Sequence, residues 1–280
     1  MNAIEIKGLT KNYPGFSLGP LDLSLPAGCI LGLVGENGAG KSTTIKLILD
    51  MIRRDSGSIT VLGRDNRDNL HLTKEDIGVV LDEVGIPDCL DTKKVGKVMA
   101  GIYRNWDQAA YERYLKELSI PVGKMFKNFS RGNKMKLGIA IALSHGAKLL
   151  ILDEATSGLD PVVRDEVVTL FHEFTRNPGH SVLISSHIVS DLEKLCDYIA
   201  FLHKGKLLLC EEKDVLLGEF CIVRGTAEQL TPLDRNAIIG SKTNAYGGEV
   251  LIRRSGVPDG MAVSPITIEE LFLFMIKEAK

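Results

Sequence analysis

Residues 35–42 read Gly35-Glu36-Asn37-Gly38-Ala39-Gly40-Lys41-Ser42 and fit the pattern G-x-x-x-x-G-K-[ST]. Glycines at this spacing let backbone N–H groups curl around phosphate groups without a Cβ in the way. In this pattern the side chain of Lys41 reaches the β- and γ-phosphates of a nucleoside triphosphate, and the Ser42 hydroxyl binds Mg²⁺. A glycine-rich turn that contains a lysine by chance is the alternative, and the flanking sequence decides between the two.

The flanking sequence favours a strand before this loop and a helix after it. Residues 29–34 form an apolar run of strand length, and residues 42–52 place Ile45, Leu49 and Ile52 on one helical face. The next residue of the loop, Thr43, then lies in the first turn of that helix, whose positive N-terminal end favours the same anion. Strand, glycine loop and helix in this order predict that the chain binds a nucleoside triphosphate.

The composition is that of an ordinary globular protein, with 280 residues of which 44% are hydrophobic and 25% are charged. A formal net charge of −2 gives no basic excess, so we expect no nucleic acid partner. The five cysteines are widely spaced and odd in number, which argues against a disulfide framework or a metal site and favours a reducing compartment. The N-terminus lacks the apolar core of a signal peptide, and no apolar run reaches the roughly 18 residues of a membrane helix, so we expect a cytoplasmic protein.

Apolar runs of strand length alternate with helix-like segments along most of the chain. The predicted strands are residues 3–7, 18–25, 58–62, 77–81, 148–152 and 181–185, with a hairpin formed by 198–203 and 206–210. The predicted helices among them are residues 161–176 and 190–196, the second opened by a capping box of Ser190 and Glu193. Such alternation predicts an α/β fold with a mostly parallel sheet covered by helices.

Two segments differ from this pattern. Residues from about 85 to 146 are rich in charged and helix-forming residues and predict a helical subdomain. Residues 219–280 combine short β-rich runs with a capped amphipathic helix at residues 267–278. The sequence therefore predicts a main domain of residues 1–218, which includes the helical subdomain, and a small α+β accessory domain of residues 219–280.

A second apolar run, residues 148–152, ends in the carboxylates of Asp153 and Glu154. In nucleotide-binding proteins with such a glycine loop, a buried strand that ends in Asp delivers this side chain to the Mg²⁺ of the bound nucleotide. The next residue, Glu154, is placed to orient and polarise a water molecule. A core strand that ends in two surface acids is the alternative, and the glycine loop upstream favours the nucleotide site.

Two later features have simple structural explanations of their own. Asp160 is well placed as a helix N-cap, with Pro161 at the first helical position of residues 161–176. His187 follows the predicted strand at residues 181–185, where an ordinary surface or core histidine is the default interpretation. A functional role for either residue needs further support.

These motifs, in this order, resemble those of the ATP-binding subunits of ABC (ATP-binding cassette) transporters. The decisive stretch is Phe129-Ser130-Arg131-Gly132-Asn133, which stands where this family has its Leu-Ser-Gly-Gly-Gln signature and would open a helix at residues 134–145. The run Ser157-Gly158-Leu159-Asp160 is similar to the family's D-loop. The resemblance covers about residues 3–215 and implies a P-loop NTPase cassette, with a mostly parallel core sheet, antiparallel N-terminal strands and a helical subdomain.

The resemblance implies an ATPase that uses ATP and Mg²⁺, and it implies roles for individual residues. Tyr13 would stack on the adenine ring, Glu154 would orient the attacking water and His187 would be the switch histidine that contacts the γ-phosphate. Three residues would hold Mg²⁺ directly or through water: Ser42, Asp82 and Asp153. The remaining residues implied to bind ATP are Gly35, Glu36, Asn37, Gly38, Ala39, Gly40, Lys41, Ser42 and Thr43, with Asp160 as the D-loop aspartate and Ser130, Gly132 and Asn133 completing the site of a partner subunit.

Three positions depart from the family pattern. Asp82 stands where most members carry the glutamine of the Q-loop, and it adds a negative charge beside the phosphates. Arg131 replaces the first glycine of the signature, and Asn133 replaces its glutamine. Arg131 either points away from the nucleotide or adds a positive charge near it, and the sequence leaves both interpretations open.

Family members act as head-to-tail dimers, in which each ATP lies between the glycine loop of one subunit and the signature of the other. The resemblance therefore implies a second ABC ATPase subunit, identical or a sister chain, and a polytopic membrane subunit that holds the protein at the inner face of the membrane. A cleft lined by residues 82–90 would receive a short cytoplasmic helix of that membrane subunit. Tyr103 and Trp106 either contribute to this contact or pack within the helical insertion.

Residues 77–83 and 129–132 resemble, more narrowly, the bacterial branch whose ATPases drive exporters of drugs, bacteriocins and cytolytic peptides such as phenol-soluble modulins. The energy-coupling ATPase of an exporter is therefore the first hypothesis. A soluble ABC ATPase without a transporter is the second, and a slowly hydrolysing, nucleotide-responsive regulator is the third. A membrane partner separates the first from the second, and measured turnover separates the first from the third.

Overall fold

A computed structural model describes residues 1–68, 74–156, 158–244 and 247–278 of the chain. Its centre is a sheet of six strands in the order β10-β9-β3-β8-β7-β6, in which all neighbouring pairs except β10 and β9 are parallel. The strands are β3 (Ile30–Val34), β6 (Ile77–Val80), β7 (Leu149–Asp153), β8 (Ser181–Ser186), β9 (Tyr198–His203) and β10 (Lys206–Glu212). The mostly parallel sheet of the predicted α/β fold is confirmed, as is the hairpin of β9 and β10.

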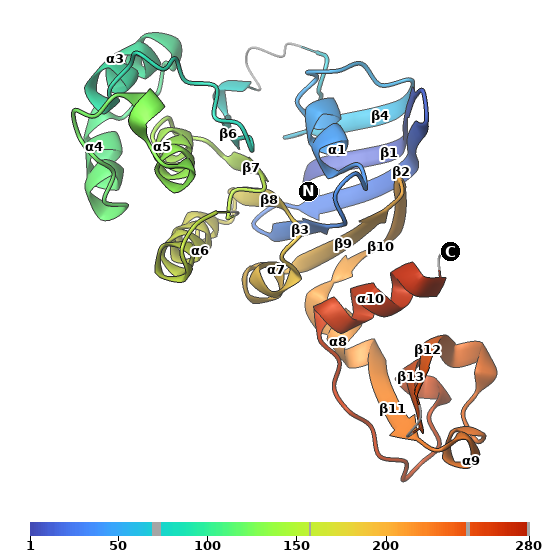
Figure 1. Cartoon of the computed structure of the whole chain (residues 1–280). Coiled ribbons are helices and arrows are strands. Elements are labelled where there is room, and N and C mark those ends of the chain that lie inside the picture. Colours follow the sequence, from blue (N-terminus) through green and yellow to red (C-terminus); the bar gives the residue numbers. More distant parts are fainter. Residues whose placement is uncertain (69–73, 157, 245–246, 279–280) are drawn as a thin grey trace.

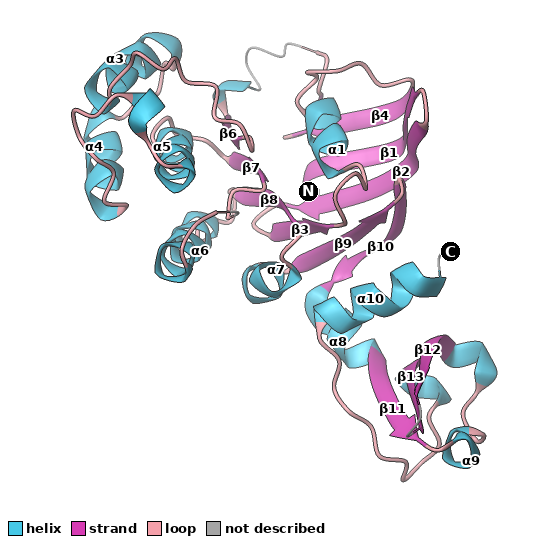
Figure 2. Ribbon diagram, viewed as in Figure 1, coloured by secondary structure: helices cyan, strands magenta, loops and turns pink. Residues whose placement is uncertain are grey.

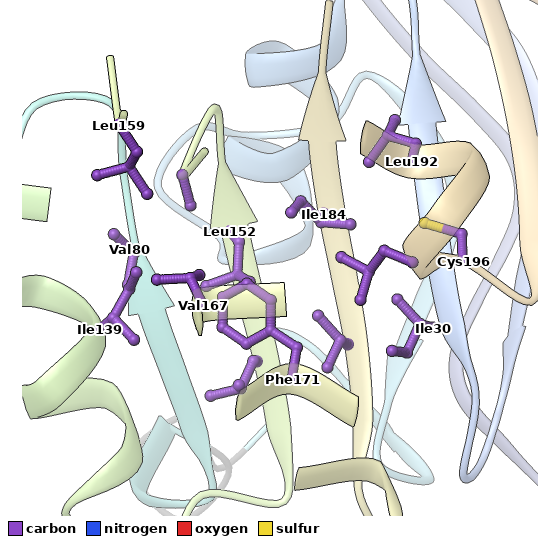
Figure 3. Packing of buried hydrophobic residues seen from close by; sticks show 14 of the residues in the cluster. Ile30, Val80, Ile139, Leu152, Leu159, Val167, Phe171, Ile184, Leu192 and Cys196 are labelled. Atoms are coloured by element: carbon purple, nitrogen blue, oxygen red, sulfur yellow. The ribbon is translucent and has the colours of Figure 1, made fainter. Parts of the chain in front are cut away.

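Both faces of this sheet are covered, so every residue of β3, β7 and β8 is buried. On one face, α6 (Pro161–Thr175) and α7 (Val189–Leu195) form a buried cluster with the sheet, and Figure 3 shows Val167 and Phe171 of α6 beside Leu152 and Ile184. Alternate residues of the same strands belong to a second cluster, shared with α1 (Lys41–Ile48) and the N-terminal strands. Because both faces of the sheet are covered, the ends of its strands are held in place. The polar residues of the predicted site lie at these ends.

The N-terminal strands form a second, antiparallel sheet, which Figure 2 shows beside α1. Its order is β2-β1-β4-β5, with β1 (Asn2–Tyr13), β2 (Phe16–Pro26), β4 (Ser56–Val61) and β5 (Arg64–Asp65). The first two strands are longer than the predicted runs 3–7 and 18–25, because their pairing continues to Tyr13 and Phe16 at the turn. The antiparallel N-terminal strands implied by the family resemblance are therefore present.

Three helices stand beside β6 at one end of the central sheet (Figure 1). They are α3 (Thr92–Ile102), α4 (Gln108–Glu117) and α5 (Arg131–Leu143), with a 3₁₀ turn at Phe126–Asn128. Packing of α5 on β6 is close, since a Cβ added to Gly138 would lie 3.2 Å from Cγ1 of Val80. The helix begins at Arg131, earlier than the predicted residues 134–145, because the Ser130 side chain caps it by accepting a hydrogen bond from the N–H of Asn133 (3.3 Å).

Tyr103 and Trp106 pack within this group of helices. The ring of Tyr103 stacks on His145, with ring centroids 4.0 Å apart, and the ring of Trp106 lies 5.1 Å from that of Tyr111. Trp106 also donates a hydrogen bond from Nε1 to Oε1 of Gln108 (3.0 Å). Of the two interpretations of these aromatic side chains, packing within the helical insertion is therefore the one that the structure supports.

The predicted capping box at the start of the helix at residues 190–196 is wrong. Helix α7 begins at Val189 with Ile188 as its N-cap, so Ser190 lies inside the helix and has no capping role. Glu193 instead accepts a hydrogen bond from the N–H of Ile268 (3.2 Å), at the start of the last helix of the chain. The partner of Glu193 is thus set by tertiary packing, which a local pattern does not contain.

The C-terminal part contains a third sheet, antiparallel, in the order β11-β13-β12. Its elements are α8 (Lys213–Glu219), β11 (Phe220–Gly225), α9 (Ala227–Leu230), β12 (Ile238–Asn244), β13 (Gly247–Arg253) and α10 (Ile268–Glu278), with 3₁₀ turns at Arg235–Ala237 and Arg254–Gly256. Thr267 and Glu270 cap α10 by reciprocal hydrogen bonds, as predicted for this helix. Helix α10 returns to the main part of the molecule, where the ring of Phe272 lies 5.1 Å from that of Phe201 in β9. The domain boundary at residue 218 stays a prediction.

Candidate functional site

The glycine-rich loop, residues 35–40, connects the end of β3 to the start of α1. Two of its glycines have no room for a side chain. An added Cβ at Gly35 would lie 2.5 Å from the carbonyl oxygen of Leu202 in β9, and one at Gly40 would lie 2.6 Å from Cδ1 of Leu18 in β2. Gly40 also has a φ of 112°, a conformation that residues with side chains rarely adopt. The close packing of the loop against both sheets therefore requires these glycines.

The side chain of Lys41 curls back over this loop. It is 6% exposed, and its Nζ donates a hydrogen bond to the carbonyl oxygen of Gly35 (2.7 Å) and lies 3.3 Å from Oε1 of Glu154. A buried ammonium group needs such partners, and they hold Lys41 between the loop and the end of β7. Among the other residues predicted to bind phosphate, Glu36, Asn37, Gly38 and Ser42 are exposed, Thr43 is half-buried and Ala39 is buried.

The two carboxylates at the end of β7 are held by the neighbouring strand β8. Asp153 is 4% exposed and accepts a hydrogen bond from Oγ of Ser185 (2.5 Å). Glu154 has a φ of 54°, in the left-handed region that non-glycine residues seldom occupy, and its N–H donates to the carbonyl oxygen of Ser185 (3.1 Å). Backbone strain of this kind is concentrated at functional sites, and here it accompanies a side chain that meets two other candidate residues.

His187 is the third member of this group. Its Nδ1 lies 2.7 Å from Oε2 of Glu154, while Oε1 of the same carboxylate faces Nζ of Lys41. The Glu154 side chain is 13% exposed and that of His187 is 45% exposed, so the carboxylate lies between a buried cation and an imidazole that solvent reaches. The structure thus brings together the three residues predicted to be catalytic, Lys41, Glu154 and His187.

The residues of the predicted signature stand elsewhere, at the start of α5, which Figure 1 shows apart from the loop before α1. Ser130 is exposed, and Gly132 and Asn133 are half-buried. The guanidinium group of Arg131 forms an ion pair with the carboxylate of Asp82, with Nη2 and Oδ1 2.5 Å apart. Two of the three departures from the family pattern are therefore in direct contact.

Two further candidate residues lie near the ends of other elements. Asp160 caps α6, because its Oδ1 accepts a hydrogen bond from the N–H of Val163 (3.1 Å) and Pro161 is the first helical residue, as predicted. Ser157, earlier in the same motif, lies outside the described residues. Tyr13 ends β1 with its side chain 40% exposed, and Nζ of Lys11 lies 5.5 Å from the ring centroid.

A cavity of about 570 Å³ opens between the segment that follows β6 and the first turn of α5. Asp82, Ile86 and Asp88 line it on one side, and Phe126 and Lys134 line it on the other. It occupies part of the cleft predicted at residues 82–90. The lining therefore combines apolar side chains with charges of both signs.

Two residues of the site were not predicted as site residues from the sequence. Ser185 orients Asp153 and also lies 3.2 Å, through Oγ, from the N–H of Glu154. Ser185 could have been identified from the sequence, because it is a polar residue at the end of a predicted apolar strand. His203 is 6% exposed, with Nδ1 3.3 Å from Oε2 of Glu36 in the glycine loop. A single histidine at the end of β9 has no local signal that distinguishes it from a core residue.

Comparison with known proteins identifies similar chains. Residues 18–157 match the model of a family described as "ABC transporter". The chain is 36% identical to the lantibiotic transport ATP-binding protein SrtF of Streptococcus pyogenes over 222 residues, which cover 75% of this chain and 91% of that protein. It is also 36% identical to the bacitracin transport ATP-binding protein BcrA of Bacillus licheniformis over 208 residues, which cover 73% of this chain and 68% of that protein.

Solved structures with a similar fold are likewise ATP-binding subunits or cassettes. The ATP-binding subunit of an ABC transporter superposes with a TM-score of 0.69 at 27% identity, over 76% of this chain and 90% of that chain. The ATP-binding cassette MJ0796, in a post-hydrolysis state with ADP and Pi, superposes with a TM-score of 0.68 over 75% of this chain and 98% of that one. At 19% identity the second likeness concerns the fold alone.

Proposed function

The chain belongs to the ABC transporter family as an ATP-binding subunit, an ATPase, and from that premise we propose that it powers an exporter of drugs or amphipathic peptides. Its relatives are named for lantibiotic transport, bacitracin transport and daunorubicin/doxorubicin resistance. These names favour a transporter ATPase over a soluble ATPase without a membrane partner. The observation that carries the proposal for the site is the contact of Glu154 with both Lys41 and His187.

Hydrolysis of ATP needs cations that offset the charge of the phosphates and a residue that orients or deprotonates the attacking water. Lys41, which now donates to the carbonyl oxygen of Gly35, would move to the β- and γ-phosphates when ATP enters the loop. Glu154, released from Lys41, would then accept a hydrogen bond from the water that attacks the γ-phosphorus. His187 would hold the carboxylate through Oε2 and contact the γ-phosphate. As the water oxygen bonds to the γ-phosphorus, its proton passes to Glu154 and the bond from the γ-phosphorus to the bridging oxygen breaks. ADP and inorganic phosphate then leave, and Glu154 releases the proton.

The oxygen donors beside the loop fit Mg²⁺, which prefers hard ligands and keeps several waters. The Ser42 hydroxyl and the Asp153 carboxylate would hold it, and Asp82 would act through a metal-bound water. The hydrogen bond from Ser185 already orients the buried carboxylate of Asp153 for such a task. When bound, the ion would offset the negative charge of the β- and γ-phosphates.

A second ATPase subunit, identical or a sister chain, would complete each site. The start of α5, which carries Ser130, Gly132 and Asn133, lies apart from the loop before α1 in the same subunit (Figure 1). We therefore propose that these residues contact the ATP of a partner in a head-to-tail dimer. ATP binding would close such a dimer, and hydrolysis would let it open. The half-exposed ring of Tyr13 is accessible for stacking on adenine, and Asp160 stands at the start of α6 as the D-loop aspartate.

A polytopic membrane subunit would carry the substrate and hold the protein at the cytoplasmic face of the membrane. The helices of the described residues include none that could span a bilayer. The cavity bordered by Asp82, Ile86 and Phe126 would receive a short helix of that subunit. Residues 1–218 would then form the ATPase domain, and residues 219–280 would form an accessory domain packed against it.

The test is a pull-down of the tagged Glu154→Gln chain from detergent-solubilised membranes of its own cell, with ATP present. Retained ATP should keep the complex assembled, so we expect a polytopic membrane protein in stoichiometric amount, whose identity would indicate the substrate. The Lys41→Ala chain, which should lose ATP, is the control for nucleotide dependence. Recovery of soluble partners alone would contradict the transporter role.

A further inference from the structure

The ion pair of Asp82 and Arg131 joins two segments that are distant in the sequence. Asp82 follows β6 by two residues, and Arg131 is the first residue of α5. Their side chains are 50% and 59% exposed, and Nη2 of Arg131 lies 2.5 Å from Oδ1 of Asp82. The pair thus stands at the surface, where a second subunit could cover it.

Arg131 also contacts a third segment, the loop after β7. A Cβ added to Gly158 would lie 3.4 Å from Cδ of Arg131, so the aliphatic part of the arginine lies against this loop. The two loops are neighbours, because Val80 of β6 pairs with Leu152 of β7. Asp82 therefore stands at the same edge of the sheet as the carboxylates that follow Leu152.

The ion pair would add little to the attachment of helix α5 to the sheet. Helix α5 already packs on β6 through Gly138 and Val80, and its buried residues belong to the main core cluster. An exposed ion pair contributes little to stability, because water screens the charges and two long side chains lose freedom. The pair is thus not needed to attach α5 to the sheet.

The negative charge of Asp82 has a larger effect on the binding of ATP. Asp153 and Glu154 already place two carboxylates at this edge of the sheet, and ATP brings several further negative charges. A third carboxylate would repel the phosphates, and the repulsion would grow when a partner subunit covers the site and excludes water. Arg131 cancels this charge within the same chain.

We propose that Arg131 is the built-in counter-ion of Asp82 and thereby sets the concentration of ATP at which the dimer closes. The inference rests on the head-to-tail dimer proposed above. It makes Arg131 a positioning residue, since it acts on the nucleotide through Asp82. It also accounts for the paired departure from the family pattern, because a neutral glutamine at position 82 would need no such partner.

The test measures dimer formation against ATP concentration by light scattering, in the slowly hydrolysing Glu154→Gln chain as the parent. We expect Arg131→Gln, which leaves Asp82 unpaired, to need about tenfold more ATP, because like charges at the separations of a covered site are worth a decade in affinity or more. Arg131→Lys keeps the charge and should stay within about twofold of the parent. Lys127→Gln, an exposed cation on the 3₁₀ turn before α5, is the matched control and should not differ.

The double variant Asp82→Asn with Arg131→Gln tests whether the charge of Asp82 or its contact with Arg131 matters. It removes the contact but leaves position 82 neutral, and the asparagine oxygen can still accept a hydrogen bond from a metal-bound water. Recovery to within about twofold of the parent would support the counter-ion role. A double variant as impaired as Arg131→Gln alone would overturn it in favour of a mechanical tie, and an unimpaired Arg131→Gln would overturn it outright. If the Glu154→Gln chain with Arg131 intact binds ATP yet stays monomeric, the head-to-tail dimer of the proposed function is contradicted instead.

Discussion

Glu154 combines a constrained backbone with a side chain that has two charged or titratable partners. Its left-handed φ of 54° costs on the order of 1–3 kcal/mol in a non-glycine residue. Hydrogen bonds from its N–H to the backbone and side chain of Ser185 hold this conformation. The conformation turns the carboxylate to the place where it meets both Lys41 and His187, which supports a role in hydrolysis.

We therefore predict that Glu154→Gln retains ATP binding but loses a factor of about 100 or more in kcat, the usual range for a lost general base. Glutamine keeps the shape of the side chain but does not accept a proton from water. Phosphate release at saturating ATP measures kcat, and a fluorescent ATP analogue measures affinity. Turnover within a few-fold of wild type would remove Glu154 from the catalytic role.

A second prediction for a single residue concerns Lys41. Lys41→Ala should abolish measurable ATP binding, because the loop then lacks its cation and Glu154 loses its partner at 3.3 Å. Lys46→Ala is the matched control, since Lys46 lies on the same helix α1 with its side chain exposed. Equilibrium dialysis with labelled ATP compares the two, and equal affinity of both variants with wild type would exclude Lys41 from the site.

Among the strands, loops and helices, those specified by residues adjacent in the sequence could be predicted. The strand β3, the glycine loop and helix α1 follow from residues adjacent in sequence, and so does Asp160 as a cap. The capping box at Ser190 failed because Glu193 is used by Ile268, far along the chain. The ion pair of Asp82 with Arg131 was likewise not predictable, since it depends on how α5 packs beside β6.

His145, two residues beyond the end of α5, should make the stability of the protein depend on pH. His145 is fully buried, stacks on Tyr103 and has its two ring nitrogens 3.1 and 3.3 Å from the carbonyl oxygens of Ile141 and Ile77. Burial lowers the pKa of His145 below its ordinary value, and the hydrogen bonds to the two carbonyl groups offset only part of this effect. Near pH 6 the unfolded chain therefore binds a proton at this position more often than the folded chain does.

The free energy of unfolding should thus fall as the pH drops below about 6.5, by at most about 1.4 kcal/mol per pH unit from this one group. His145→Gln, which does not titrate, should have a flatter dependence between pH 7.5 and 5.5, measured by urea denaturation. His172→Gln, on the exposed side of α6, serves as the control and should keep the wild-type slope. Equal slopes for His145→Gln and wild type would contradict this origin of the pH dependence.

At the scale of the whole molecule, the helical insertion and the C-terminal sheet lie at opposite ends of the central sheet (Figure 1). Helix α10 links the C-terminal part to the centre, because Phe272 is 6% exposed and packs on Phe201 of β9. The buried side chains of α10 belong to the same hydrophobic cluster as those of α6 and α7. Such a shared core favours unfolding of both parts in one step.

Phe272→Ala tests this coupling. Trp106, the only tryptophan of the chain, lies between α3 and α4 in the helical insertion and reports on that part of the molecule. Loss of a buried phenylalanine should cost about 3 kcal/mol. If the two parts unfold together, the urea midpoint seen by Trp106 fluorescence falls as far as the midpoint seen by circular dichroism. Leu273→Ala, on the next residue and 40% exposed, should change neither midpoint appreciably. A Trp106 transition unchanged by Phe272→Ala would mean that residues 219–280 unfold independently of the ATPase domain.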